Sequence, residues 1–481
     1  MHSPAPDNVT PLDVSANLER CLELQRRSFL QNETESLAER RQHLLNLKRM
    51  VSENRDAIVE AISKDYGNRS RHETLFAEII TATDSIIDAI KHLRRWMKVQ
   101  RRSVDQTMYP GGKARVIPQP LGVVGLIIPW NFPINLTISQ LAAVFAAGNR
   151  AMVKMSENSI ALSQLLIDVV PRYFDEDKLA FFEETGGVGI EFSKLPFDHL
   201  IFTGSGQTGR AVMAAAAANL TPVTLELGGK APAVIAPDYP IEKAVERILF
   251  VKQFNAGQIC TNVDYVFVHE SQVDGFVEAA KAWAGVHCPD IASVDYTSLI
   301  DDRSFKRVAA TLEDARDKGA EIVNLHGQEP DAENRKFPLT LVLNTTEDMT
   351  IRQREIFGPL LPVVSYREPD EVIDYVNRND RPLALYPFTK DKQLAARYID
   401  RVMSGGVTVN DALFHVAQHD LPFGGVGPSG MGHYHGYEGF ITFSKLRPVY
   451  YQPSFTATKY LMPPYGDFAD RVLNFLANRK K

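Results

Sequence analysis

Three side chains in this sequence suit acyl-transfer chemistry, and the first of them is Cys260. It ends the segment FNAGQIC, in which Gly257 permits a tight backbone just before the thiol. A thiolate is a strong nucleophile, but a lone cysteine is often an inert, buried, small hydrophobe. Taken alone, Cys260 leaves both interpretations open.

The other two candidates are Glu226 and Asn131. Glu226 lies in the apolar run TLELGGK, so burial should raise its pKa, which suits a general base. The alternative is an ion pair with a lysine such as Lys230. Asn131 lies in PWNFP, directly after an apolar strand, and its amide could donate to an oxyanion there. The alternative is a role in the turn.

A glycine pattern predicts nucleotide binding. The segment FTGSGQTGR contains Gly204, Gly206 and Gly209 between an apolar run and an alanine-rich run. Such a strand–loop–helix unit places a pyrophosphate at a helix N-terminus, with Gly204, Ser205 and Gly209 as contacts. The spacing rule would also assign Glu226 to the ribose.

A second charged pair offers another ribose site. Lys154 and Glu157 lie in KMSEN, just past a different strand, and together they could hold the adenosine ribose. The alternative is solvated surface charge. His415 and His419, and His433 and His435, lack the neighbouring glutamate or cysteines of a zinc site, so we expect no metal.

The elements that must position these residues follow an α/β pattern. Apolar runs alternate with helical stretches, which predicts buried parallel strands. The expected strands are 121–128, 150–154, 179–183, 199–203 and 222–227, and then 265–269, 321–325, 339–343, 361–364 and 407–410. A capping box at Ser36 predicts a helix start. A hairpin is expected from strands 104–109 and 113–118, and an amphipathic helix over 467–476.

Length and composition exclude several classes of protein. The chain has 481 residues, a net charge of −6 and 44% hydrophobic residues, which is ordinary for a globular protein of two or three domains. Nothing indicates a nucleic-acid partner, and no stretch approaches the roughly 18 to 20 apolar residues of a membrane span. Three scattered cysteines favour a reducing, cytoplasmic setting.

The ordered motifs resemble those of the aldehyde dehydrogenase superfamily. They are PWNFP, KMSEN, FTGSGQTGR, LELGGK, FNAGQIC, EIFGP and PFGGVGPSGMG, and the similarity extends from about residue 20 to 450. The segment GMGHYHG and the following Phe-Ser-Lys are similar to the class 3 branch and, within it, to bacterial coniferyl aldehyde dehydrogenases.

The resemblance implies an aldehyde dehydrogenase-like α/β fold. Two α/β domains with parallel-type sheets are accompanied by a small β oligomerisation segment, and the subfamily is dimeric, so a homodimer is expected. The implied division is 1–98 and 122–226 for NAD(P) binding, 227–416 for catalysis, and 99–121 and 417–481 for oligomerisation.

The resemblance also implies roles for named residues. Cys260 would attack the aldehyde, Asn131 and the Cys260 N–H would form the oxyanion hole, and Glu226 would activate water against the thioester. NAD is the implied cofactor, with NADP as an alternative because Met155 replaces the usual proline. The implied cofactor contacts are Lys154, Glu157, Gly204, Ser205, Gly209, Glu355, Phe357 and Trp130.

The substrate is expected from one loop. Phe414 and His415 lie in the stretch that corresponds to the family's substrate-entrance loop, where a phenylalanine could stack on an aromatic ring and a histidine could accept from a phenol. We therefore expect an aromatic enal such as coniferyl aldehyde, oxidised to ferulate. Aliphatic or fatty aldehydes, an acyl-forming dehydrogenase, a cysteine hydrolase and a non-catalytic binding protein remain as alternatives.

Overall fold

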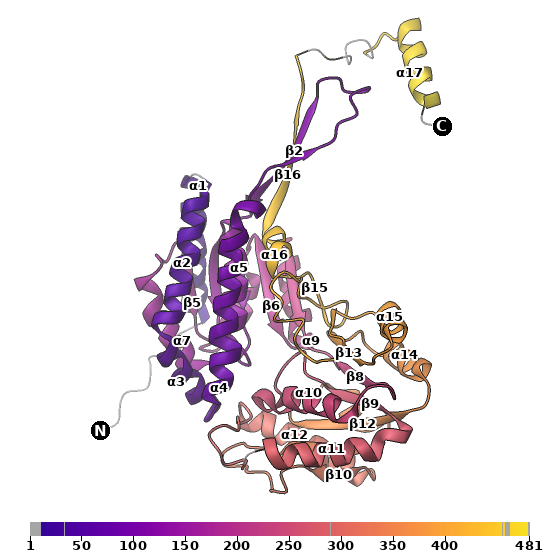
Figure 1. The fold of residues 1–481 in the computed structure, drawn as a ribbon. Coiled ribbons are helices and arrows are strands. Elements are labelled where there is room, and N and C mark those ends of the chain that lie inside the picture. Colours follow the sequence, from indigo (N-terminus) through magenta and orange to yellow (C-terminus); the bar gives the residue numbers. More distant parts are fainter. Residues whose placement is uncertain (1–10, 33, 289, 455, 457–461, 480–481) are drawn as a thin grey trace, which may run out of the picture.

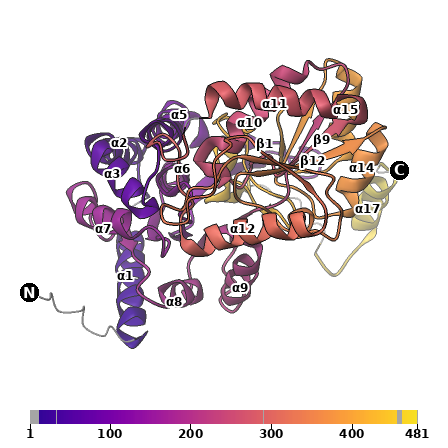
Figure 2. The same ribbon diagram turned by 90° about the horizontal axis from the view of Figure 1, so that it is seen from below.

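The computed structural model describes residues 11–32, 34–288, 290–454, 456 and 462–479. Two α/β lobes lie side by side, and a narrow β-ribbon projects from them (Figure 1). Seen from below, the helices of the two lobes surround the strands (Figure 2). The catalytic candidates lie between these lobes, as described below.

The first lobe is built on a six-stranded sheet in the order β15-β7-β6-β3-β4-β5. Its strands are parallel except β15, which runs antiparallel to β7. The bounds are β3 (Val123–Ile127), β4 (Arg150–Lys154), β5 (Leu179–Phe182), β6 (His199–Gly204), β7 (Val223–Leu227) and β15 (Gly430–Met431).

Helices cover both faces of this sheet, which explains its continuous apolar strands. Val124 and Leu126 of β3 face one core, whereas Val123 and Ile127 face the other. The first core includes α2 (Leu37–Glu53), α3 (Arg55–Tyr66), α5 (Thr81–Trp96), α6 (Pro133–Ala147) and α7 (Ile160–Val169); the second includes α1 (Pro11–Gln31), α8 (Val188–Lys194) and α9 (Gly206–Ala217). The capping box predicted at Ser36 is confirmed at the start of α2.

The second lobe has a seven-stranded sheet in the order β10-β11-β12-β9-β8-β13-β14, with only β10 antiparallel to its neighbour. Its strands are β8 (Pro232–Ile235), β9 (Tyr265–His269), β10 (Glu321–Asn324), β11 (Thr340–Leu343), β12 (Leu360–Tyr366), β13 (Ala384–Phe388) and β14 (Gly406–Val407). Around it lie α10 (Ile241–Gln253), α11 (Val273–His287), α12 (Asp302–Asp317), α14 (Pro369–Arg378) and α15 (Lys392–Arg401).

Shorter helical segments complete the two lobes. They are α4 (Arg71–Thr74), η1 (Leu75–Ile80), η2 (Val170–Arg172), η3 (Phe254–Gly257), η4 (Glu270–Gln272), α13 (Thr350–Gln353) and α16 (Gly436–Thr442).

The predicted strands overlap observed strands in both lobes, although 407–410 shares only Val407 with β14. Three strands of the lobes lie outside the predicted set: β8 and β13, which contain Pro232 and Pro387, and the two-residue β15. Proline is unusual in central strands. The expected α/β fold with parallel-type sheets is confirmed, and each of these two sheets carries one antiparallel edge strand, β10 or β15.

The projecting ribbon is a three-stranded antiparallel sheet, β1 (Gln100–Arg102), β2 (Lys113–Pro120) and β16 (Ser444–Tyr451). The expected arm over 104–109 is wrong, since the paired segment is 100–102. The side chain of Asp105 accepts from the N–H groups of Thr107 and Met108 at 2.9 and 3.3 Å, and this local turn competes with strand pairing.

The predicted C-terminal helix is confirmed as α17 (Asp467–Arg479), which lies beyond the tip of the ribbon (Figure 1). Phe468, Leu473 and Phe475 on it are exposed. No helix in the described ranges has the length and apolar character needed to cross a membrane.

Candidate active site

The candidate residues come from both lobes. Asn131 follows β3 by four residues and Glu226 lies near the end of β7. Ligand sites in open parallel sheets gather at this carboxyl edge. Cys260 comes from the second lobe, three residues after η3. The contacts between the lobes therefore decide whether these three residues meet.

A strained turn presents Cys260. Asn255, Ala256 and Gly257 have φ angles of 53°, 50° and 73°, a left-handed region that only glycine adopts without cost. A methyl group on Gly257 would lie 2.4 Å from the carbonyl oxygen of Gly358. The FNAGQIC and EIFGP motifs thus touch, and glycine at 257 is needed for that contact.

Asn131 is fixed against this turn by buried hydrogen bonds. Its side-chain Nδ2 donates to the carbonyl oxygen of Gln258 at 3.3 Å, and that carbonyl lies two residues before Cys260. The backbone oxygen of Asn131 accepts from the Tyr66 hydroxyl at 3.2 Å and from Asn255 Nδ2 at 3.3 Å. The amide of Asn131 is therefore held beside the thiol, where it can donate to an oxygen bound at Cys260.

Glu226 is buried without a partner. Its side chain is 2% exposed, and neither carboxyl oxygen has a hydrogen-bond partner within the described part of the chain. Burial raises the pKa of this carboxyl well above its ordinary value. Lys230 contacts Asp264 instead, so the alternative ion pair with Glu226 is not formed.

The glycine-rich motif closes over Glu226. Strand β15 places Gly430 opposite Glu226, and a methyl group on Gly430 would lie 2.2 Å from the oxygen of Leu225. The N–H of Leu227 also donates to the oxygen of Ser429 at 3.1 Å. The dense glycines of PFGGVGPSGMG are thus explained by close backbone packing.

The thiol of Cys260 has a high pKa. Burial is the main cause, the carboxyls of Glu355 and Glu226 act in the same direction, and the backbone N–H groups of Thr261 and Cys260 oppose them; the result is a pKa of about 12. Two acids from different lobes therefore lie close enough to affect the thiol. No cationic side chain is among the described groups that shift the pKa of this thiol.

The EIFGP motif contains two further predicted cofactor contacts, Glu355 and Phe357. Burial raises the pKa of Glu355 to about 8, and a methyl group on Gly228 would lie 2.1 Å from its carboxyl oxygen. The Phe357 ring meets Trp130 edge to face, with centroids 5.5 Å apart. Phe357 and Trp130, both predicted cofactor contacts, are therefore packed against each other.

A buried ion pair holds the Glu355 segment in place. Lys230 Nζ contacts Asp264 and donates to the carbonyl oxygens of Ile351 and Arg354 at 3.0 and 2.9 Å. The other oxygen of Asp264 accepts from the N–H of Ile356 at 2.8 Å. Lys230 thus has a structural partner of its own.

The predicted nucleotide residues lie at the carboxyl ends of β4 and β6, on either side of β3 in the first sheet. Ser205 caps α9, accepting from the N–H of Thr208 at 3.2 Å, so the first turn of this helix is open to an anion. Lys154 ends β4, and Glu157 follows it on the surface. Lys154 pairs with Glu184, with Nζ and Oε2 2.7 Å apart, rather than with Glu157.

This edge fits a nicotinamide dinucleotide. Open space surrounds Gly186 and Gly187, where a methyl group would meet no atom within 4 Å, next to a lysine and two carboxylates able to hold ribose hydroxyls. The sequence analysis missed Glu184, although its place directly after β5 is the same signal that identified Lys154.

A second buried ion pair, also missed, supports Asn131. Glu78 Oε2 accepts from the N–H groups of Ile134 and Asn135 at 3.0 and 2.7 Å, at the start of α6. Glu78 Oε1 pairs with Arg69 at 2.7 Å, and both side chains are fully buried. The carboxylate thus caps the helix that follows Asn131.

A cavity leads to Cys260 between the lobes. Its walls are mostly aromatic or apolar, and the lining residues include Phe76, Phe132, Leu136, Phe254, Leu413, Phe414, Phe423 and Tyr434. Phe414 lies where the sequence predicts a substrate contact. His415 instead hydrogen-bonds through Nδ1 to Thr408 Oγ1 at 2.8 Å and packs against Tyr386, whereas His419 and His435 line the cavity.

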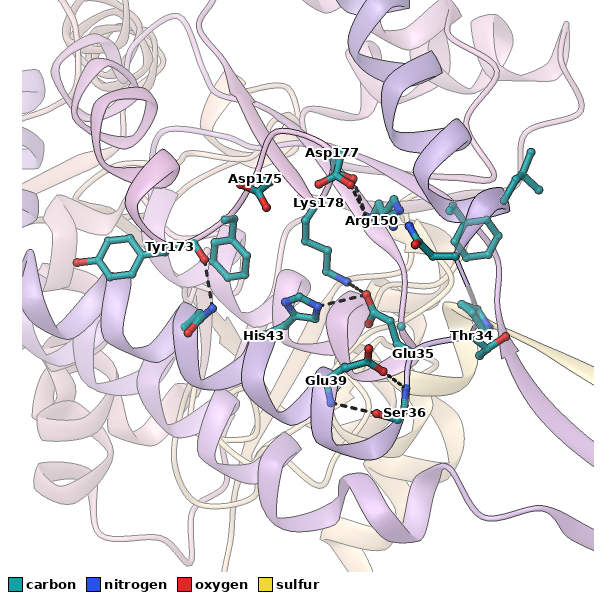
Figure 3. A pocket seen from close by; sticks show the side chains of 17 residues that line it. Thr34, Glu35, Ser36, Glu39, His43, Arg150, Tyr173, Asp175, Asp177 and Lys178 are labelled. Carbon is teal, nitrogen blue, oxygen red and sulfur yellow. Dashed lines mark hydrogen bonds and ion pairs between the residues drawn. The ribbon is translucent and has the colours of Figure 1, made fainter.

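A separate polar cavity lies in the first lobe, away from the thiol (Figure 3). Its volume is about 630 Å³. Lys178 Nζ donates to Glu35 at 2.7 Å, and His43 lies 3.3 Å from the same carboxylate oxygen. Lys178 also donates to the oxygen of Asn149 at 2.8 Å, so this group joins the start of α2 to the sheet.

The fold and the site define a two-lobed α/β oxidoreductase with a thiol at the interface and a nucleotide edge beside it. The chain belongs to the aldehyde dehydrogenase family, whose model matches residues 10–449. It is thus an enzyme that oxidises an aldehyde group with a nicotinamide cofactor.

Similar proteins support the same conclusion. The "Probable coniferyl aldehyde dehydrogenase" of Pseudomonas aeruginosa is 47% identical over 457 residues, 95% of each chain. The "Coniferyl aldehyde dehydrogenase" of a Pseudomonas species is 45% identical over 89% of each chain. A substrate-bound Staphylococcus aureus AldH structure matches with a TM-score of 0.89 at 33% identity, covering 95% of this chain and 99% of that one. The predicted similarity to the class 3 branch and its bacterial coniferyl aldehyde dehydrogenases is confirmed.

Proposed function

We propose that this chain oxidises an aromatic enal of the coniferyl aldehyde type to its carboxylic acid, with Cys260 as nucleophile. The observation that carries the proposal is the aromatic-walled cavity that ends at this thiol. Stacking between aromatic rings favours a flat, conjugated substrate. The two Pseudomonas relatives, named as coniferyl aldehyde dehydrogenases, support the same choice.

The first step forms a bond to Cys260. The thiolate sulfur attacks the carbonyl carbon, a C–S bond forms, and the carbonyl electron pair moves to oxygen. Asn131 Nδ2 and the backbone N–H of Cys260 donate to that oxygen and stabilise its charge. The nicotinamide cofactor, when bound, supplies the oxidising power by accepting a hydride from this carbon, which leaves a thioester.

Glu226 completes the reaction. Its free carboxylate takes a proton from water, the hydroxide attacks the thioester carbon, and the C–S bond breaks to release the acid and the thiol. A buried carboxyl with a raised pKa is suited to this exchange because its carboxylate is a stronger base than an ordinary one. Hydrolysis should accelerate as the pH rises through that pKa.

A substrate panel tests the proposal. We expect kcat/KM to be highest for coniferyl aldehyde, lower for benzaldehyde and lowest for medium-chain aliphatic aldehydes, measured as NADH formation. Cys260→Ala should abolish oxidation while cofactor binding, followed by fluorescence titration, is retained. A clear preference for the aliphatic aldehydes would overturn the substrate assignment but not the assignment to the family.

For the cofactor we propose NAD over NADP. Glu157 and Glu184 flank Lys154, and the lysine charge is already neutralised by Glu184 at 2.7 Å. A 2′-phosphate would meet two carboxylates there and be repelled. Parallel kcat/KM measurements with both cofactors test this, and equal values would contradict it.

We also propose a homodimer. The ribbon of β1, β2 and β16 projects from the body (Figure 1) and carries exposed Tyr109, Tyr450 and Tyr451. Projecting strands of this kind pair with or pack on a second chain. Light scattering of the full chain measures the state, and a monomer at micromolar concentration would refute it.

A further inference from the structure

The cavity at Cys260 has a polar end that the apolar walls do not explain. Among its lining residues, Ser139, His419 and His435 also line a second, smaller chamber. Cys260 does not line that chamber, so the three polar residues lie at the part of the cavity that faces away from the thiol. A purely apolar substrate would give these groups no partner.

Both histidines of this group have a ring nitrogen without a hydrogen-bond partner among the described residues. Within the described part of the chain, Nδ1 of His419 and Nδ1 of His435 make no hydrogen bond. His435 is only 8% exposed, and the two rings lie 6.2 Å apart. Buried polar atoms normally make hydrogen bonds. A ligand with a polar group here would therefore remove the free-energy cost of leaving these nitrogen atoms without a partner.

His435 is held in an unusual conformation. Its φ is 81°, immediately before Gly436 at 54°, and non-glycine residues adopt such angles rarely, often at functional sites. Burial lowers the pKa of its imidazole to about 3, with His419 and His415 adding to the effect. The ring is therefore neutral at physiological pH and carries one donor and one acceptor nitrogen.

The spacing along α6 matches an aromatic enal. Ser139 lies six residues after Pro133, the first residue of α6, which directly follows the cavity residue Phe132, a rise of about 9 Å. This is close to the reach from the carbonyl carbon of a phenylpropenal to a hydroxyl on the far side of its ring. Ser139 Oγ donates to Asn135 Oδ1 at 2.9 Å, which leaves its lone pairs free to accept.

The smaller chamber limits what can lie beyond the ring. Its volume is about 20 Å³, which is space for about one water-sized group. A hydroxyl fits such a space, whereas the continuation of a long alkyl chain does not. Trp96, which also lines it, has an indole Nε1 without a partner among the described residues.

We infer that Ser139, His419 and His435 form a subsite that binds the phenolic hydroxyl of the substrate ring. The inference rests on the proposed function and makes it more specific, because it assigns selectivity to the ring hydroxyl rather than to ring stacking alone. His415, the histidine that the sequence singled out, has no part in this subsite.

The test compares three phenylpropenals that differ at one position. Wild-type kcat/KM is measured at pH 7 with cinnamaldehyde, 4-hydroxycinnamaldehyde and 4-methoxycinnamaldehyde. A site built to hydrogen-bond a hydroxyl should favour the 4-hydroxy compound over cinnamaldehyde by about 10- to 100-fold. The methoxy compound cannot donate a proton, so it should lose most of that advantage.

Variants then locate the effect. The double variant Ser139→Ala with His419→Phe should lower the hydroxyl preference, the ratio of kcat/KM for the 4-hydroxy compound to that for cinnamaldehyde, to about threefold or less. His435→Asn, which keeps a shorter polar side chain at this position, should lower it part of the way. His433→Phe is the matched control, since His433 is an exposed histidine in the same loop and the preference should stay unchanged.

The outcomes separate this inference from the proposed function. If cinnamaldehyde and its derivatives are not oxidised at all, the proposed function fails. If they are oxidised but wild-type kcat/KM differs less than about threefold between the 4-hydroxy compound and cinnamaldehyde, the subsite is refuted and the function stands. A preference that survives in the double variant also refutes the subsite, and the wild-type comparison decides even if that variant does not fold.

Discussion

The thiol of Cys260 should be slow to react in the cofactor-free protein. Its pKa of about 12 lies three units above the ordinary 9.0, which lowers the thiolate fraction at pH 7 about 1,000-fold. A more basic thiolate is also a better nucleophile, by about 16- to 32-fold over three pKa units. The two effects together predict alkylation about 30- to 60-fold slower than for an ordinary cysteine.

The assay is iodoacetamide labelling of the cofactor-free protein between pH 7 and pH 10. Quenched samples are digested, and mass spectrometry gives the rate for the Cys260 peptide, with Cys21 and Cys288 quantified in the same digest and a small free thiol as reference. The logarithm of the rate should rise by about one for each pH unit, without a plateau, because the pKa lies above the range.

The carboxyl neighbours provide a control for the cause of the shift. Burial raises the pKa of Glu226 well above its ordinary value and that of Glu355 to about 8, and burial, rather than either carboxylate, is also the largest cause of the raised thiol pKa. Glu226→Gln should therefore change the labelling rate at pH 7 by less than about threefold. This outcome would assign the shift to burial rather than to nearby negative charge.

The result that would refute this account is a plateau in the labelling rate below pH 9. A labelling rate at pH 7 equal to that of the free reference thiol would also refute this account. Either outcome would mean that the thiolate is stabilised without the cofactor. Labelling in the presence of NAD should be faster, since the positive ring of the bound cofactor favours the thiolate.

Four further predictions concern the carboxyls and the amide. Asn131→Ala should lower kcat by about 10² to 10³ because one oxyanion donor is lost; steady-state turnover near the wild-type value would exclude that role. Glu226→Gln should keep the first-turnover burst of NADH and accumulate an acyl adduct on Cys260, visible by mass; a normal steady-state rate without adduct would count against it. Glu78→Gln should lower the free energy of unfolding by about 3 to 5 kcal/mol in urea titrations, since it leaves a buried arginine unpaired; a loss below about 1 kcal/mol would contradict the pairing. Glu35 has a folded pKa of about 2, lowered by His43 and Lys178 against the effect of burial. Its stabilising contribution is therefore present above its ordinary pKa of 4.5 and lost as the pH falls from there towards 2, and Glu35→Gln should flatten the stability profile in that window.

Much of the fold was accessible from pattern alone. Apolar runs such as Arg150–Lys154 and Tyr265–His269 coincide with β4 and β9, because strands buried on both faces need continuous apolar sequence. The pattern failed where local chemistry competed with it. Strands β8 and β13 contain proline, which counts against a strand in the pattern, and the turn at Asp105 occupies residues that were expected to form one strand of the ribbon.

The site was predicted in its parts but not in its contacts. Sequence context selected Cys260, Glu226 and Asn131, since each type of side chain at a strand end or tight turn suits one chemical role. It could not show that Lys154 pairs with Glu184, because that partner follows the neighbouring strand β5, 30 residues further along the chain. Nor could it distinguish His415 from His419, which lie on the same loop.

By itself, the sequence determined the class of chemistry and the order of the elements that carry it. Residue type fixes what a side chain can do, and the period of apolar residues fixes whether a segment is strand or helix. The tertiary structure alone decided which groups meet. The approach of the second lobe brings the partly buried Cys260 near the buried Glu226, with both of their pKa values raised, and the turn at His435 places polar atoms at the end of an apolar cavity. Both effects depend on contacts between segments far apart in the chain, and local sequence does not encode those distances.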